Sequence, residues 1–318
     1  MKKVVVFSQL DAEILARLEK NYQVVHINPK LGDVNTQILQ HAQDADGMIG
    51  AGRLLNAKNL HGATRLKVIS SVSVGYDNYD VAYLTQQGIQ LCNTPHVLTE
   101  TTADLAFTLL MSAARQVAYL DAWTKSGQWQ RTAAQAQFGQ DIFGKTIGIV
   151  GLGQIGVAIA RRGFYGFNMK VLYHSRHAKP EVAESLNAEY CELQDLLQRA
   201  DFVVVAVDLN KDSKALIGAT ELACMQKHAV LVNIARGAVL DEQALITALK
   251  NQQIFAAGLD VYQQEPLQNS ELFNLPNVVT LPHIGSATLS TRQKMAELAY
   301  QNLVDALDGR TPRYVVNP

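Results

Sequence analysis

Three side chains able to bind an anion or transfer a proton lie far apart in the sequence, but each stands just past a short apolar segment. They are Arg236, Glu265 and His283. Ligands of open α/β sheets bind beyond the carboxyl ends of parallel strands, so we expect these side chains to converge on one crevice. An arginine binds a carboxylate or carbonyl oxygen, a histidine donates a proton, and a glutamate holds the histidine in its charged form. Together they suit the reduction of a 2-keto acid.

A nucleotide-binding motif lies in KTIGIVGLGQIGVAIARR. Gly151, Gly153 and Gly156, with Gln154 and Ile155 between the last two, follow an apolar segment and open a segment of helical spacing. The first glycine permits a tight turn, the second lets the backbone approach a pyrophosphate, and the third lets the helix pack on the strand. The amino terminus of that helix faces the anion. The motif therefore predicts a dinucleotide-binding domain.

The residues after the next apolar segment favour a phosphorylated cofactor. An NAD-binding unit places an acid about 20 residues after the last glycine, where it accepts from the ribose 2′-hydroxyl. Here Ser175 and Arg176 stand at that point. A charge-assisted hydrogen bond to a 2′-phosphate is worth roughly 1.5–3 kcal/mol, or one to two decades in affinity. The loop also holds His174, His177 and Lys179, so Arg176 is alternatively a solvated arginine. NADP(H) is preferred and NAD(H) is possible.

Length and composition indicate a cytoplasmic protein of two domains. The 318 residues exceed what one core usually serves, and 48% of them are hydrophobic. A formal net charge of -1 gives no reason to expect nucleic acid or an anionic membrane as partner. The apolar runs are far shorter than the ~18 residues of a membrane span, and the apolar stretch near Met1 is too short for a signal peptide. Three cysteines without a Cys-x-x-Cys pair predict neither a disulfide framework nor a metal site.

Short apolar segments alternate with segments of helical spacing twice along the chain, which predicts an α/β protein with two doubly wound parallel sheets. The last helical segment, 291–309, has no strand of its own, so we expect it to cross back to the first domain. That domain is then discontinuous, 1–98 and 288–318, and 99–287 form the dinucleotide-binding (Rossmann) domain. The expected strands are residues 4–7, 24–27, 47–50, 67–70, 89–92, 147–150, 171–174, 202–207, 230–234, 256–261 and 278–281.

Four motifs, VGLGQIG, NIARG, AGLDVYQQEP and LPHIGSAT, resemble in their order and spacing the D-isomer-specific 2-hydroxyacid dehydrogenase family, over nearly the whole chain. Within it, SVSVGYDNYDV, NTPHVLTETTAD and the closing VVNP are most similar to the bacterial glyoxylate/hydroxypyruvate reductases that also reduce 2-ketogluconate. The resemblance implies a flavodoxin-like substrate domain beside the Rossmann domain. It also implies that Arg236, Glu265 and His283 are catalytic.

The same resemblance implies further site residues. The backbone amides of Val74 and Gly75, in SVG, match the loop that binds the substrate carboxylate. Asp260 matches the aspartate that contacts the nicotinamide carboxamide. Gly285 and Ser286 match residues that line the nicotinamide and the substrate.

Two other segments have more than one interpretation. Arg53, in AGRLLN, lies in a loop that faces the substrate in relatives, where it either contacts a sugar acid or is solvated; the solvated interpretation is favoured because arginine is mostly exposed. Trp129, Gln137 and Phe138 lie in a segment that in similar enzymes reaches the substrate site of the partner subunit, which predicts a homodimer. The alternative is an ordinary loop with buried aromatic side chains.

Three functional hypotheses follow. The favoured one is an NADPH-dependent reductase of glyoxylate, hydroxypyruvate or 2-ketogluconate. The second is an NAD-linked dehydrogenase of another D-2-hydroxy acid, and Ser175 and Arg176 argue against it. The third is a non-catalytic dinucleotide-sensing protein of the same fold, and the set of Arg236, Glu265 and His283 argues against that.

Overall fold

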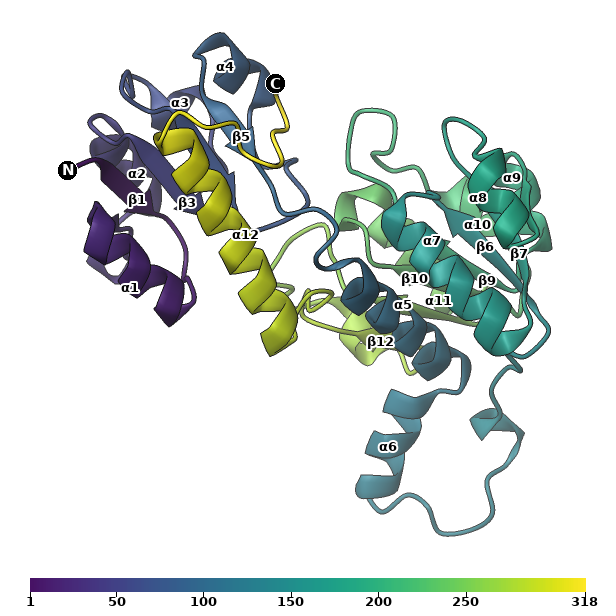
Figure 1. The fold of residues 1–318 in the computed structure, drawn as a ribbon. Helices are drawn as coiled ribbons and strands as arrows, with labels where there is room; N and C mark the ends of the chain where they lie inside the picture. Colours follow the sequence, from purple (N-terminus) through teal and green to yellow (C-terminus); the bar gives the residue numbers. More distant parts are fainter. The chain divides into compact units, whose positions relative to one another are not determined.

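The computed structural model describes residues 1–318, which divide into two compact units (Figure 1). The first unit consists of Met1–Leu98 and Ala287–Pro318, and the second of Thr99–Ser286. Each unit contains one parallel sheet with helices on both faces. The expectation of an α/β fold with two doubly wound sheets is therefore confirmed.

The sheet of the first unit has the strand order β2-β1-β3-β4-β5, the flavodoxin-like order. One face packs on α2, α3 and α4, and the other on α1 and α12. Both faces are buried, which explains why the strands read as nearly continuous apolar runs. The elements are β1 Lys3–Val6, α1 Ala12–Asn21, β2 Gln23–His26, η1 Pro29–Leu31, α2 Val34–Ala42, β3 Gly47–Gly50, α3 Ala57–Leu60, β4 Val68–Ser71, α4 Val81–Gln86, β5 Gln90–Cys92 and α12 Leu289–Leu307.

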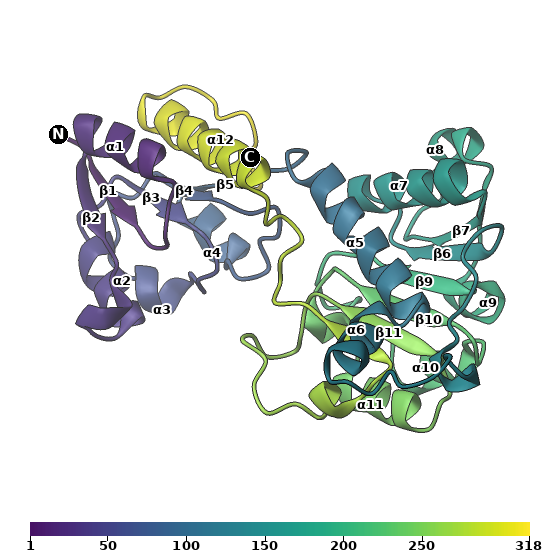
Figure 2. The same cartoon turned by 90° about the horizontal axis from the view of Figure 1, so that it is seen from below.

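Helix α12, nearly 200 residues after β5 in the sequence, belongs to this first sheet. It lies alongside α1 (Figure 2) and contacts β3, β4 and β5. Two buried hydrogen bonds attach it: Ser70 Oγ donates to Ala299 O at 2.7 Å, and Asn302 Nδ2 donates to Asn93 O at 3.1 Å. The helix thus completes the apolar layer on one face of the sheet.

The sheet of the second unit has the order β12-β11-β10-β9-β6-β7-β8. This is the Rossmann order extended by one strand. Helices α5 and α7 cover one face, and α9, α10 and α11 the other. The elements are α5 Thr99–Ala114, α6 Val117–Lys125, η2 Gln135–Gln137, β6 Thr146–Val150, α7 Gln154–Arg161, the π-helical turn η3 Arg162–Gly166, β7 Lys170–His174, α8 Pro180–Ser185, β8 Ala188–Tyr190, α9 Leu193–Arg199, β9 Phe202–Val205, α10 Ala219–Cys224, β10 Val230–Asn233, η4 Gly237–Val239, α11 Glu242–Lys250, β11 Ala256–Leu259, η5 Glu271–Asn274 and β12 Val278–Thr280.

All the expected strands are present, with ends within two residues of those predicted. Strand β8 was not predicted. It is a three-residue edge strand in which Glu189 and Tyr190 are exposed, so it lacks the apolar run that identifies its neighbours. No helix combines the length and the apolar character needed to cross a membrane.

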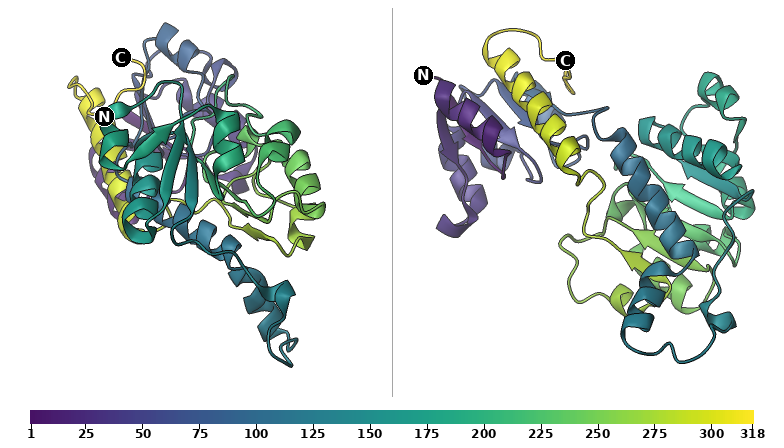
Figure 3. Two further views of the ribbon diagram at one scale, coloured as in Figure 1. Left: turned by 90° about the vertical axis from the view of Figure 1, so that its right-hand side faces the viewer. Right: turned by 60° about the horizontal axis from the view of Figure 1, so that its bottom comes forward.

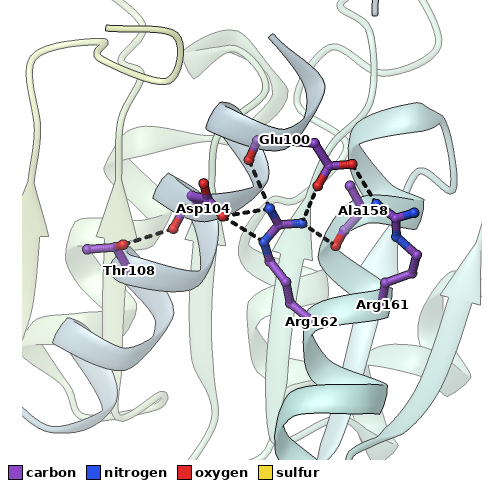
Figure 4. Close-up of polar contacts among 6 residues, drawn as sticks. All are labelled: Glu100, Asp104, Thr108, Ala158, Arg161 and Arg162. Carbon is purple, nitrogen blue, oxygen red and sulfur yellow. Dashed lines mark hydrogen bonds and ion pairs between the residues drawn. The ribbon is translucent and has the colours of Figure 1, made fainter. Parts of the chain in front are cut away.

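A charged cluster of Glu100, Asp104, Arg161 and Arg162 joins α5 to the end of α7 (Figure 4). Arg162 donates from Nη2 to Asp104 Oδ1 at 2.6 Å and from Nη1 to Ala158 O at 2.8 Å. Burial would lower the pKa of Arg162, but hydrogen bonds to the carboxylates of Asp104 and Glu100 outweigh it and raise that pKa. Because α7 starts in the glycine motif, the cluster fixes that helix against α5.

Candidate active site

Arg236, Glu265 and His283 follow β10, β11 and β12, which are neighbours in the second sheet. All three strands are parallel, so the three loops leave the sheet at the same edge. The structure thus places the predicted catalytic side chains on adjacent loops of one unit. Their roles in a reaction stay predictions.

The closest polar contact in this group joins the histidine to the glutamate. His283 Nδ1 lies 2.6 Å from Glu265 Oε2, and Tyr262 N donates to Glu265 Oε1 at 3.0 Å. A carboxylate at this distance accepts a hydrogen bond from Nδ1–H, which leaves Nε2 to face a reactant. Burial would raise the pKa of Glu265, but the hydrogen bonds from His283 and Tyr262 and the charges of His283 and Arg236 lower it. Glu265 is therefore ionised at neutral pH.

The backbone around Arg236 is held by Asn233, the last residue of β10. Asn233 Nδ2 donates to Arg236 O at 3.0 Å, and Asn233 Oδ1 accepts from Ala235 N at 3.0 Å. At the next residue, Gly237, a Cβ atom would lie 1.7 Å from the carbonyl carbon of Tyr262. Only glycine lets the Arg236 loop lie this close to the loop that carries Glu265.

Asp260 positions the loop that carries the histidine. Its buried carboxylate accepts from Ile284 N at 2.7 Å and from Gly285 N at 2.8 Å. Burial raises the pKa of Asp260, and those two amides and the charge of His283 oppose the shift. His283 has a φ of 53°, a left-handed conformation that costs a non-glycine residue about 1–2 kcal/mol. The two bonds to Asp260 stabilise this turn. The contact of Asp260 with the nicotinamide carboxamide stays a prediction.

The glycine motif fits a dinucleotide pyrophosphate. A Cβ atom on Gly156 would lie 2.1 Å from Gly151 O, whereas a Cβ atom on Gly153 would meet nothing within 4 Å. The third glycine therefore serves close packing, and the second leaves the space that a phosphate needs. Gln154 is the first residue of α7 and is exposed, and Ile155 is partly buried against the core beneath the helix.

The loop after β7 carries the predicted phosphate readers. Ser175 Oγ donates to His177 O at 2.7 Å, which closes the turn. The exposed guanidinium of Arg176 makes no hydrogen bond or ion pair within the chain, so it is available to a ligand. Lys179 Nζ donates to Leu152 O at 2.8 Å and so ties this loop to the glycine motif. The sequence did not reveal that contact, which spans 27 residues.

The remaining predicted residues are divided between the units. Gly285 is buried beside Asp260, and Ser286, partly exposed, follows it in the second unit. Val74 and Gly75 follow β4 in the first unit, and Arg53 follows the neighbouring strand β3. Arg53 makes no side-chain hydrogen bond or ion pair, and its carbonyl accepts from Asn78.

The Rossmann-type sheet, the glycine motif and the paired imidazole and carboxylate define a dinucleotide-dependent oxidoreductase. Residues 107–285 match the family model for the NAD binding domain of D-isomer specific 2-hydroxyacid dehydrogenases. The chain belongs to this family, and the resemblance inferred from its motifs is confirmed.

Relatives match over nearly their whole length. The chain is 45% identical to glyoxylate/hydroxypyruvate reductase B of Citrobacter koseri, over 99% of this chain and 98% of the relative. It is 44% identical to the protein of the same name from Salmonella typhimurium, with the same coverage. Among solved structures, the TT0316 protein of Thermus thermophilus matches with a TM-score of 0.89 and 39% identity over 99% of both chains. The NADPH-dependent glyoxylate/hydroxypyruvate reductase of Sinorhizobium meliloti, in complex with NADP and malonate, matches with a TM-score of 0.87 and 32% identity over 99% of this chain and 96% of that one.

Proposed function

We propose that this chain is an NADPH-dependent reductase that converts small 2-keto acids, namely glyoxylate, hydroxypyruvate or 2-ketogluconate, to D-2-hydroxy acids. The observation that carries the proposal is the 2.6 Å contact between His283 Nδ1 and the ionised carboxylate of Glu265. The loop that carries Glu265 is next to the loop that carries Arg236. The names of the relatives support the substrate class, because they match at 43–45% identity over 98% of their length.

Each side chain then has a defined task. His283 donates the proton at Nε2 to the carbonyl oxygen of the substrate, while Glu265 holds Nδ1 and stabilises the charged imidazole. Arg236 binds the carboxylate or the carbonyl oxygen and stabilises the negative charge that develops there. The backbone amides of Val74 and Gly75 bind the substrate carboxylate. Reduced nicotinamide supplies the hydride when bound.

The cofactor preference rests on the loop after β7. Ser175 and Arg176 offer donors and a positive charge, and no acid of this loop accepts from a ribose hydroxyl. The glycine motif, with Gly153 open to a phosphate, would hold the pyrophosphate. NADPH is therefore the preferred cofactor.

A homodimer is part of the proposal. Helix α6 has no buried residue, although VAYLDAW is largely apolar. It and the loop that follows extend away from the sheet of the second unit (Figure 3). In that loop Trp129 is 63% exposed and Phe138 is 61% exposed, so an ordinary loop with buried aromatics does not describe it. A second copy of this chain would cover these side chains.

Initial rates with NADPH and with NADH on the three keto acids test the cofactor and the substrate. We expect a preference of about ten-fold or more for NADPH, because one charge-assisted hydrogen bond corresponds to one to two decades. The preference should collapse in Arg176→Ala. The matched control is Lys170→Ala, which removes an exposed cation at the other end of β7. Equal rates with NADH in the wild type would favour the NAD-linked alternative.

Replacing His283 by glutamine separates an enzyme from a dinucleotide sensor. We expect H283Q to bind NADPH as the wild type does in a fluorescence titration and to lose turnover. Unchanged turnover would show that His283 is not the proton donor. A wild-type chain that binds NADPH but reduces none of the three acids would support the sensing alternative.

A further inference from the structure

The loop that follows β4 has three consecutive carbonyl groups that all accept hydrogen bonds within the first unit. Ser73 O accepts from Thr94 N at 2.9 Å, and Val74 O accepts from Asn93 Nδ2 at 2.9 Å. Gly75 O accepts from Ser73 Oγ at 2.7 Å. The amides of Val74 and Gly75, in contrast, donate to no acceptor in the chain. The carbonyls are thus turned inward while two successive amides remain available.

The geometry of the peptide bond links the direction of these carbonyls to the direction of the amides. In a trans peptide the C=O and N–H groups point in opposite directions across a plane. Val74 O and Gly75 N–H share a plane, so the bond from Asn93 also fixes the direction of the Gly75 amide. In the same way, Ser73 O and Val74 N–H share a plane, so the bond from Thr94 N to Ser73 O fixes the direction of the Val74 amide. Two successive amides on the same side form an anion-binding concavity.

Glycine makes this orientation reversible. Turning over the plane between Val74 and Gly75 changes ψ of Val74 and φ of Gly75, and a glycine tolerates either sign of φ. The turned plane would present a carbonyl oxygen to an incoming carboxylate. A donor on the inner side is needed to prevent this.

We infer that Asn93 is a positioning residue for substrate binding: its side-chain amide holds the plane between Val74 and Gly75 so that the Gly75 amide faces the carboxylate. The inference rests on the proposed function, since it takes the Val74 and Gly75 amides as the carboxylate site. Asn93 follows β5 directly and is not among the site residues expected from the sequence.

Asn93 is itself held in place by buried contacts. It is 9% exposed, and its own carbonyl accepts from Asn302 Nδ2, a side chain that is 0% exposed on α12. The bond from Asn302 Nδ2 satisfies the buried carbonyl of Asn93, whereas Asn302 Oδ1 is buried without a partner. These contacts link α12 through Asn93 to the peptide plane at Val74.

A second set of hydrogen bonds also supports this loop. Tyr79 Oη lies 2.9 Å from Ser71 Oγ, which lies 2.6 Å from Ser73 Oγ. Ser73 uses its only proton on Gly75 O, so Ser71 donates to Ser73 and Tyr79 donates to Ser71. Burial raises the pKa of Tyr79, which keeps the phenol protonated as a donor.

The test uses the full chain with NADPH and compares Asn93→Ala with Ser70→Ala. S70A is the matched control, because it removes a buried hydrogen bond between β4 and α12 without touching the loop. In N93A we expect the KM for glyoxylate and the inhibition constant of malonate to rise about ten-fold, the size of one charge-assisted hydrogen bond. The KM for NADPH should stay at the wild-type value. S70A should lower the melting temperature and leave all three constants unchanged. Asn93→Asp, which keeps the shape but cannot donate when ionised, replaces N93A if that variant does not fold.

Selective 15N labelling of valine and glycine distinguishes a wrong carboxylate site from a wrong role of Asn93. If malonate shifts neither the Val74 nor the Gly75 amide resonance of the wild type in the presence of NADP, the proposed carboxylate site is wrong. If malonate shifts both in the wild type and binds N93A equally well, the carboxylate site stands and the role of Asn93 is refuted. Shifts in the wild type together with weak binding to N93A support the inference.

Discussion

Replacing Glu265 by glutamine removes one charge and keeps the size of the side chain. In the wild type the two oxygens accept separately from His283 Nδ1 and from Tyr262 N. Glutamine retains one acceptor oxygen, so at most a neutral hydrogen bond to the imidazole remains. The charged imidazole then loses the neighbouring anion that stabilises it.

The size of the effect follows from the change in hydrogen-bond type. A hydrogen bond to a charged group contributes about 1.5–3 kcal/mol and a neutral one about 0.5–1.5 kcal/mol. The side chains of Glu265 and His283 are 35% and 47% exposed, so solvent screening favours the low end of the difference. A loss of about 1 kcal/mol corresponds to about a five-fold lower kcat/KM.

The assay is kcat/KM for glyoxylate reduction with NADPH between about pH 5.5 and 9.5. The pKa of Glu265 lies below its ordinary value of 4.5, so its carboxylate is charged throughout this range. In E265Q kcat/KM should therefore fall about five-fold.

The control is Glu242→Gln, which neutralises an acid that accepts from Gln263 N in the loop of Glu265 but does not contact the histidine. Its profile should overlay that of the wild type. Superimposed profiles for E265Q and the wild type would refute the argument that the charge of Glu265 acts on the proton donor.

Three further variants test the structure around the site. Asp260→Asn leaves neither of the two loop amides with a charged acceptor and one of them with no acceptor, so we expect a loss of about 1–3 kcal/mol in the free energy of unfolding by urea, with a lower kcat; a wild-type kcat would show that the loop needs no such support. Arg162→Leu removes the centre of the charged cluster and should lower the melting temperature by about 2–4 °C, and an unchanged temperature would mean that α5 and α7 are held by apolar packing alone. Gly156→Ala places a Cβ atom 2.1 Å from Gly151 O, so NADPH affinity measured by fluorescence titration should fall at least ten-fold, whereas wild-type affinity would contradict the close-packing argument.

The architecture could be predicted because parallel strands buried on both faces leave uninterrupted apolar runs. The exception, β8, lies at an edge of its sheet, where only one neighbour constrains it and polar residues suffice. The strand-end rule likewise led to Arg236, Glu265 and His283 without knowledge of their distances. An apolar run thus indicates a buried strand, and burial determines most of this fold.

The supporting contacts could not be predicted, because they depend on backbone orientation. Asp260 reaches amides 24 and 25 residues further along the chain, and Asn93 reaches a carbonyl 19 residues back. No residue type indicates which way a peptide plane faces in a loop. A polar residue directly after a strand was the one signal available for Asn93, and many loops carry such a residue.

The position of α12 has a consequence for the order in which the chain folds during synthesis. The second unit is continuous in sequence, from Thr99 to Ser286, and can fold as soon as its last strand leaves the ribosome. The first sheet is synthesised earlier, but the face that α12 covers stays exposed until residue 307 has emerged. We expect ribosome-bound chains arrested shortly after Ser286 to contain a protease-resistant second unit and a protease-sensitive first one. The part of the chain made first would then be the part that folds last.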